Sequence, residues 1–150
     1  MPFLTHEIEI RRGPAVVFEA CRNVERWAGF MPAVRTAAFL ERSERSDVVS
    51  ICAEANDQLW TWCSRRTIDV GTLTITFDRL DPPPPLTFVR GIWHVSAVDR
   101  DNVRLSLSHE FGTIDCNGDM ESFFERSVRA NATRDLRALK EHLESTERPE

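Results

Sequence analysis

The stretch Trp60-Thr61-Trp62-Cys63-Ser64-Arg65-Arg66 has the composition and alternation of a β-strand. Successive strand residues point to opposite faces of a sheet, so Trp60, Trp62, Ser64 and Arg66 share one face. Two indoles, a hydroxyl and a guanidinium in one row fit the wall of a pocket for a flat, oxygen-rich ligand. The row also fits an edge strand whose tryptophans cap the core while Arg66 reaches solvent. The alternation alone leaves both interpretations open.

The residues on both sides of this strand predict an antiparallel meander. Short turns separate most of the strand-like runs, and such tight connections join antiparallel neighbours. The proline run at residues 82–85 donates no ladder hydrogen bonds and therefore predicts a stiff extended connection. The predicted strands cover about residues 36–43, 47–55, 58–67, 70–80, 87–98 and 102–112.

The two ends of the chain complete the predicted fold. Residues 3–10 alternate and predict a first strand, and Pro14 is well placed in the first turn of a following helix. Residues 28–32 break that helix and predict a loop or a short second helix. From Met120 to about Ser145 apolar residues recur at helical spacing, with Asp119 as the expected N-cap. Segregated strands and helices predict an α+β fold, with an antiparallel sheet curled around one long helix and a cavity between them.

Composition narrows the class of protein. A length of 150 residues predicts one domain over residues 1–150, and a net charge of -5 argues against nucleic-acid binding. No apolar run approaches the ~20 residues of a membrane span, and the N-terminus lacks a signal-peptide core, so we expect a cytoplasmic protein. The four cysteines and four histidines form no metal-binding or disulfide pattern, so no metal site is expected.

Two ionisable residues fall on apolar faces outside the tryptophan-rich strand. His109 shares a face with the apolar residues of the run 102–112, and Asp135 lies with Asn131 in or beside the apolar stripe of the C-terminal helix. Each has a structural explanation: a buried histidine bonded to a carbonyl, and a boundary carboxylate paired with a neighbouring arginine. Together with Arg66, however, three separate elements each direct one ionisable group towards the same predicted cavity. This convergence indicates a reactive site.

At these residues the chain resembles a known family. The tryptophan-rich strand is similar to the W-x-W-x-S-x-R strand of the aromatase/cyclases of bacterial type II polyketide synthases, and most of all to their single-domain form. The resemblance covers about residues 5–145, and its wider pattern is typical of the START-like (SRPBCC) helix-grip superfamily. The other segments that resemble the family contain its early tryptophan, its later strand tryptophan, its strand histidine and its C-terminal helix, at Trp27, Trp93, His109 and residues 131–135.

The resemblance implies a fold and an activity. The fold is a curved antiparallel sheet of about seven strands that grips the long C-terminal helix. The cavity receives a poly-β-ketone carried by an acyl carrier protein, directs one intramolecular aldol closure and promotes loss of water to form an aromatic ring. No cofactor is implied. Relatives whose Arg, His and Asp act together usually close the first ring between C7 and C12, and a homodimer through an exposed sheet edge is a further expectation.

The resemblance also assigns roles to residues. Arg66 polarises a carbonyl or stabilises an enolate, His109 moves protons as general base and acid, and Asp135 orients or activates His109 or a water. Ser64 holds a keto oxygen. The remaining residues expected to bind substrate are Trp27, Trp60, Trp62, Trp93 and Asn131.

Two departures and two alternatives accompany this hypothesis. The chain contains no tyrosine, and Val34 lies nearest to the position where some relatives carry one, so no mechanism here uses that phenol. The proline run is also unusual for the family. A non-catalytic carrier of a lipid or quinone with the same fold remains open, as does a structural or interaction domain with a filled interior.

Overall fold

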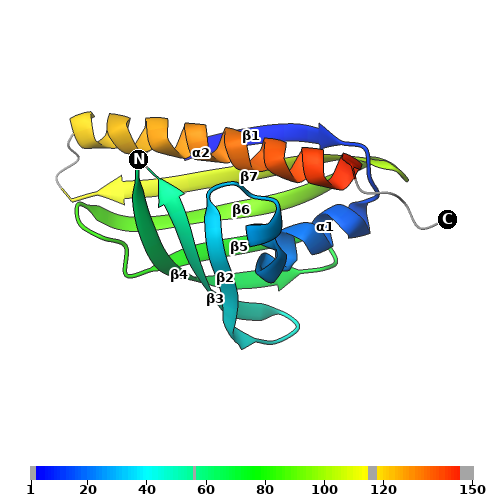
Figure 1. Cartoon of the computed structure of the whole chain (residues 1–150), viewed down its shortest axis with the longest axis horizontal. Helices are drawn as coiled ribbons and strands as arrows, with labels where there is room; N and C mark the ends of the chain where they lie inside the picture. The colour runs from blue at the N-terminus through cyan, green and yellow to red at the C-terminus, as the bar shows by residue number, and fades with distance from the viewer. Residues whose placement is uncertain (1–2, 56, 115–117, 146–150) are drawn as a thin grey trace.

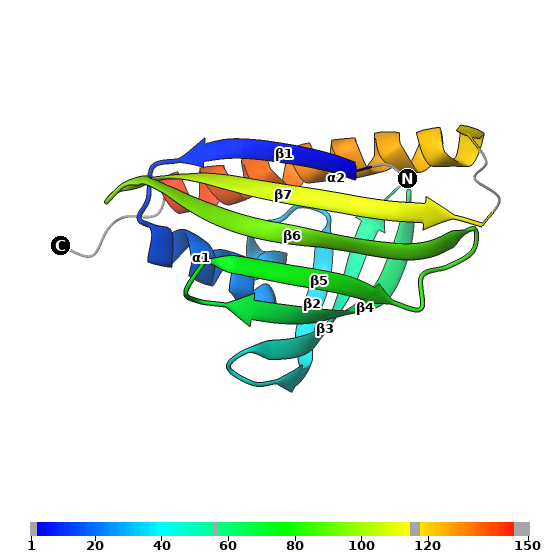
Figure 2. The ribbon, with the colours of Figure 1, turned by 180° about the vertical axis from the view of Figure 1, so that it is seen from behind.

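The computed structural model of the chain describes residues 3–55, 57–114 and 118–145. Seven antiparallel strands form one curved sheet, and the long helix α2 (Gly118–Ser145) lies along one face of it (Figure 1). The view from behind shows the strands in front of both helices, so α1 (Pro14–Arg22) covers the same face as α2 (Figure 2). This arrangement confirms the predicted α+β helix-grip fold.

The sheet has the order β1-β7-β6-β5-β4-β3-β2, so its edges are β1 and β2. The tryptophan-rich strand, β4, lies between β3 and β5, and its interpretation as an edge strand is therefore wrong. A 3-10 helix, η1 (Val24–Gly29), follows α1. The strands are β1 (Phe3–Ile10), β2 (Val34–Arg42), β3 (Ser46–Ala55), β4 (Gln58–Asp69), β5 (Thr74–Leu80), β6 (Leu86–Asp99) and β7 (Asn102–Thr113).

Apolar side chains hold the helices on the sheet. The buried residues of α2 recur at helical spacing and meet buried residues of the central strands in one hydrophobic cluster. Burying a leucine side chain stabilises a fold by about 1.5–3 kcal/mol relative to leaving it exposed, so this stripe fixes α2 against the sheet. The stripe consists of Ala132, Leu136, Leu139 and Leu143.

The largest difference from the predicted boundaries lies at residues 70–73. They were expected to begin a strand, but they form the turn between β4 and β5. Leu73 has a positive φ of 52°, and the Thr72 N–H donates to Asp69 Oδ1 at 3.2 Å, which closes the turn. At the other end of the chain, α2 begins at Gly118, so Asp119 lies in its first turn and not at the N-cap.

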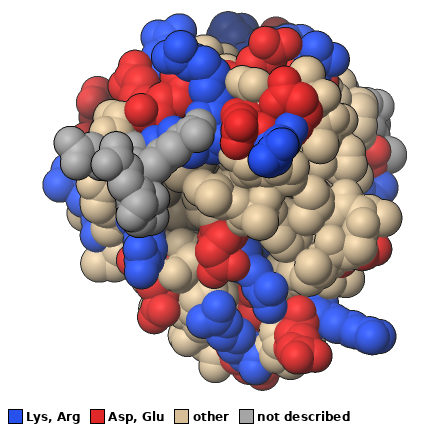
Figure 3. Space-filling model, turned by 90° about the vertical axis from the view of Figure 1, so that its right-hand side faces the viewer, with Lys and Arg blue, Asp and Glu red and all other residues tan. Residues whose placement is uncertain are grey.

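The surface carries both signs of charge. None of the helices in the described segments is long and apolar enough to cross a bilayer. At the end of the molecule that carries α1, basic and acidic side chains interleave around uncharged surface (Figure 3). This distribution differs from the continuous basic face that nucleic-acid binding uses.

Candidate functional site

The strand register places the predicted site residues on the face of the sheet that looks towards the helices. Arg66 lies opposite Phe77, Phe77 opposite Gly91, and Gly91 opposite His109. Directly opposed residues share a face, so these four form one row across β4, β5, β6 and β7. Three strand spacings, roughly 14 Å, separate the backbones of Arg66 and His109.

Arg66 is buried within a network of hydrogen bonds. Its side chain is 3% exposed, and its Nε and Nη2 donate to the two carboxylate oxygens of Asp47, each at 2.8 Å. Nη1 donates to the Cys21 carbonyl at 3.2 Å and Nη2 to the Arg22 carbonyl at 2.6 Å. These carbonyls belong to the last turn of α1, where they lack partners within the helix. Arg66 therefore ties α1 to β3 and β4.

This network bears on both interpretations of Arg66. The alternative in which Arg66 reaches solvent is wrong, because the guanidinium is buried. Its catalytic role stays a prediction, since four of the five N–H groups of the guanidinium already donate to Asp47 and to the helix carbonyls. Asp47 itself was missed in the sequence, where it is only the first residue of a predicted strand. Nearby, burial raises the pKa of the Cys21 thiol to about 12, so this thiol is not a nucleophile.

His109 has no hydrogen-bond partner for its buried Nδ1 among the described residues. The edge of its ring contacts Phe77, with ring centroids 5.6 Å apart, across Gly91. Burial, and next the positive charge of His6, lower the pKa of His109 to about 4. The imidazole is therefore neutral at pH 7.

His6 is a second histidine on this face. It lies on β1 opposite Leu107, two pairs along from the Leu4–His109 pair and on the same face, and its Nδ1 is also buried without a partner in the described segments. Burial, and next the charge of Arg129, lower the pKa of His6. The alternation of residues 3–10 already put His6 on an inward face, but its neighbour His109 became visible only when β1 paired with β7.

Asp135 lies on the flank of α2 and is 25% exposed. Nε and Nη2 of Arg134 each lie 3.2 Å from its Oδ1, which matches the structural explanation of a boundary carboxylate paired with an arginine. Burial raises the pKa of Asp135, and Arg134 opposes this effect. Asn131, one turn earlier, is half-buried. Within the described part of the chain no hydrogen bond or ion pair joins Asp135, His109 and Arg66 to one another.

The four tryptophans occupy different environments. Trp27 and Trp93 are core residues with ring centroids 6.0 Å apart, and the indole N–H of Trp27 donates to the Ala20 carbonyl at 2.9 Å. Trp60 is 38% exposed near the tip of the β3–β4 hairpin. Trp62 is half-buried on the interior face of β4. Of the four, Trp62 best fits the predicted role of a substrate-facing wall.

A polar group beside Trp62 was missed in the sequence. Arg79 on β5 lies directly opposite the buried Ser64, and its guanidinium carbon lies 5.2 Å from the centre of the Trp62 ring. The signal was present, because Ile75, Phe77 and Arg79 alternate on one face of the strand. We call Trp62, Ser64 and Arg79 the polar wall.

The polar wall lies on the face of the sheet that bears the helices. The sequence of the chain is similar to those of other proteins. A family model described as polyketide cyclase/dehydrase and lipid transport matches residues 1–144. The chain belongs to this family. The cyclase/dehydratase of actinorhodin synthesis from Streptomyces coelicolor is 30% identical over 98% of this chain and 46% of the relative. That of granaticin synthesis from Streptomyces violaceoruber is 27% identical over 89% of this chain and 41% of the relative, so the chain spans less than half of either protein.

Solved structures share the fold of this polyketide cyclase/dehydrase family member. The Zhui aromatase/cyclase from Streptomyces sp. R1128 has a TM-score of 0.87 and 23% identity over 95% of this chain and 93% of that one. The di-domain aromatase/cyclase BexL from the BE-7585A pathway has a TM-score of 0.87 and 25% identity over 96% of this chain and 47% of that one. A START superfamily protein from Mycobacterium smegmatis has a TM-score of 0.76 at 11% identity, over 94% of this chain and 98% of that one. The helix-grip fold is thus common to all three.

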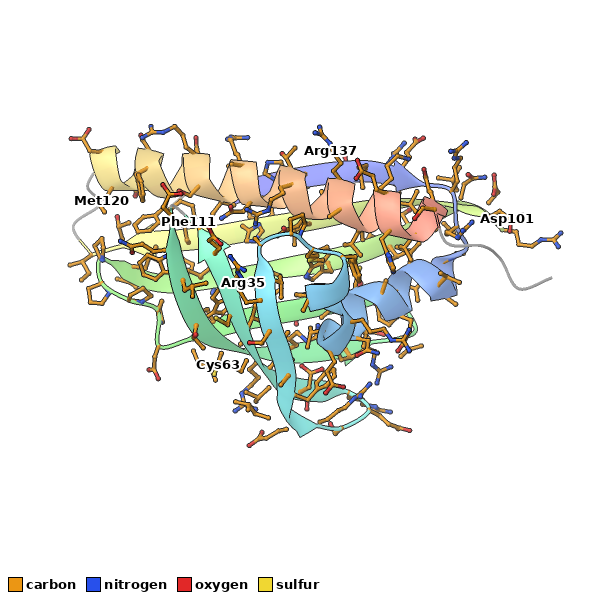
Figure 4. The ribbon with its side chains drawn as sticks, in the orientation of Figure 1. Arg35, Cys63, Asp101, Phe111, Met120 and Arg137 are labelled. Atoms are coloured by element: carbon orange, nitrogen blue, oxygen red, sulfur yellow. The ribbon has the colours of Figure 1, made fainter. Side chains whose placement is uncertain are left out.

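The structure also carries an open groove of about 550 Å³ on α2 beside Pro32. Its lining includes Arg129, Arg134 and Arg137, and Figure 4 shows Arg137 on the second half of α2. In the same view Phe111 lies beneath the first half of α2. None of the residues that line this groove belongs to the polar wall.

The lowered pKa of His109 predicts a loss of stability in acid. The pKa falls from 6.5 to about 4 on folding, so between these values the unfolded chain binds more protons and stability rises with pH. Lowering the pH from 7 to 4.5 should cost roughly 2 kcal/mol through His109. Urea unfolding at both pH values checks this. In His109→Gln the free energy of unfolding should no longer fall by this amount between pH 7 and pH 4.5. In His94→Gln, at an exposed position, it should still fall. Equal pH dependence in both variants would contradict the role of His109 in this loss of stability.

Proposed function

We propose that this protein is an aromatase/cyclase of aromatic polyketide synthesis. Its substrate is a poly-β-ketone carried by an acyl carrier protein, and its reaction is an intramolecular aldol closure followed by loss of water. The observation that carries the proposal is the combination of the polar wall with an unpartnered, neutral His109 on the same face of the sheet. Membership of the polyketide cyclase/dehydrase family supports it.

The residues of this face suit each step. A methylene between two carbonyls is acidic, and neutral His109 accepts its proton. The electron pair left on carbon attacks a second carbonyl, whose oxygen takes the proton back from the His109 imidazolium. Removal of another proton from the same carbon and departure of a protonated hydroxyl then release water. Fixed walls on the interior face favour one closure by limiting the conformations of a flexible chain.

The remaining expectations belong to this proposal. Asp135, on the flank of α2 and with a raised pKa, acts as an orienting or proton-accepting group, and Asn131 contacts substrate from the same helix. Ring closure between C7 and C12, the absence of a cofactor and a homodimer through β1 or β2 are parts of the same hypothesis.

A non-catalytic carrier of a hydrophobic small molecule is the second candidate, because the family description includes lipid transport. In that case the polar wall binds a ligand without reaction. Addition of the purified protein to a minimal polyketide synthase separates the two. We expect cyclised aromatic product in place of shunt products; an unchanged product profile, together with a co-purified small molecule found by mass spectrometry, would favour the carrier.

A further inference from the structure

We propose that Arg79, on β5, is the cation that binds the enolate or keto oxygen of the substrate. This inference rests on the proposed function and deepens it, since the resemblance had assigned that role to Arg66. The two arginines lie on neighbouring strands and on the same face of the sheet. Their surroundings differ in the one respect that matters for ligand binding, which is whether the guanidinium is already paired.

Arg79 has no hydrogen bond or ion pair among the described residues. Its Nε is buried without a partner, and the guanidinium carbon lies 5.2 Å from the centre of the Trp62 ring. Burial lowers the pKa of Arg79, but an arginine stays protonated at neutral pH. Arg79 therefore presents a half-buried, protonated guanidinium with an unpaired Nε at the polar wall.

A buried guanidinium N–H without a hydrogen-bond partner costs free energy in the empty protein. Arg66 avoids that cost through Asp47 and two helix carbonyls, whereas Arg79 does not. A bound anion or strongly polarised oxygen would compensate Arg79. Arg79 therefore lacks a hydrogen-bond acceptor among the described residues, whereas most N–H groups of Arg66 already have one.

The geometry of the polar wall specifies the chemical class of the ligand. The planar fork of an arginine matches two oxygens held in one plane, such as those of a β-diketone enolate or a carboxylate. The indole of Trp62 offers a flat apolar surface beside that fork, and the hydroxyl of Ser64 lies on the opposed residue of β4. We therefore expect a flat, conjugated anion with paired oxygens.

A binding titration tests this site without requiring catalysis. The probes are 2-naphthoate and its neutral analogue 2-naphthamide, followed through the tryptophan indole N–H signals in NMR spectra. Wild-type protein should bind naphthoate more tightly than naphthamide. Arg79→Gln should weaken naphthoate binding roughly tenfold or more and change the affinity for naphthamide by no more than about twofold. The affinity of Arg79→Lys for naphthoate should lie between those of the wild type and Arg79→Gln. Arg65→Gln, on the opposite face of β4, is the matched control and should behave as wild type.

Reconstitution with a minimal polyketide synthase separates failure of the site from failure of the function. Thermal melting first establishes that each variant folds. If wild-type protein cyclises the poly-β-ketone and Arg79→Gln cyclises it equally well and binds naphthoate equally tightly, the role of Arg79 is overturned and the proposed function stands. If wild-type protein binds naphthoate through Arg79 but leaves polyketide products unchanged, the proposed function is overturned and the anion site stands.

Discussion

Replacing Asp47 by asparagine is expected to lower the free energy of unfolding by about 3–5 kcal/mol. The carboxylate accepts two hydrogen bonds from Arg66, and both side chains are 2–3% exposed. Removing its charge leaves the buried guanidinium without a charged partner. The same change weakens the link between α1 and the sheet, because Arg66 also binds the last carbonyls of that helix.

Urea unfolding of the variant and the wild type measures this loss. The matched control is Glu54→Gln on the same strand, whose ion pair with Arg35 is exposed and should contribute at most about 1 kcal/mol. A loss for Asp47→Asn no larger than that of the control would show that the buried pair contributes little. The expected loss also means that Arg66→Ala changes stability, so reduced activity in that variant is not by itself evidence of catalysis.

The second large effect is expected at Gly91, which separates Phe77 from His109. A Cβ added there would lie 2.3 Å from Phe77 Cζ and 2.3 Å from the carbonyl oxygen of Ser108. Phe77 meets the added Cβ with a side chain, whereas the Ser108 carbonyl belongs to the backbone of β7 and moves only if the β6–β7 pairing is distorted. We expect Gly91→Ala to destabilise the fold by about 3 kcal/mol.

Gly29→Ala is the control for Gly91→Ala, because nothing lies within 4 Å of the Cβ it would add. It should leave stability unchanged or raise it by up to about 1 kcal/mol. The His109 ring signals should also shift in Gly91→Ala, since its contact with Phe77 crosses the glycine. Equal stability of the two alanine variants would contradict the close packing described for the interior row.

The local parts of this structure were predictable from the sequence. Alternation put Trp62, Ser64 and Arg66 on one face of a strand, and helical spacing identified the buried stripe of α2, because both patterns are properties of single elements. Burial of Arg66 was not predictable in this way. Its partner Asp47 lies on another strand, and their contact depends on the register between the strands, which neither segment specifies alone.

The site was predicted less completely than the fold for the same reason. His6 and His109 are neighbours only because the first and last strands pair. Arg79 was visible as part of an alternating run, but whether an arginine is paired or free depends on residues far away in the chain. The resemblance assigned roles to residues on the face that bears the helices and did not specify which cation is available to a ligand.

The most direct test of the proposed reaction is the fate of a poly-β-ketone made in situ by a purified minimal synthase from ¹³C-labelled acetate. Product analysis by mass spectrometry and NMR gives the fraction that carries one defined first-ring closure. We predict that this fraction rises with the concentration of added protein and then saturates, while shunt products fall. The same distribution of products with and without a stoichiometric amount of folded protein would contradict the proposal.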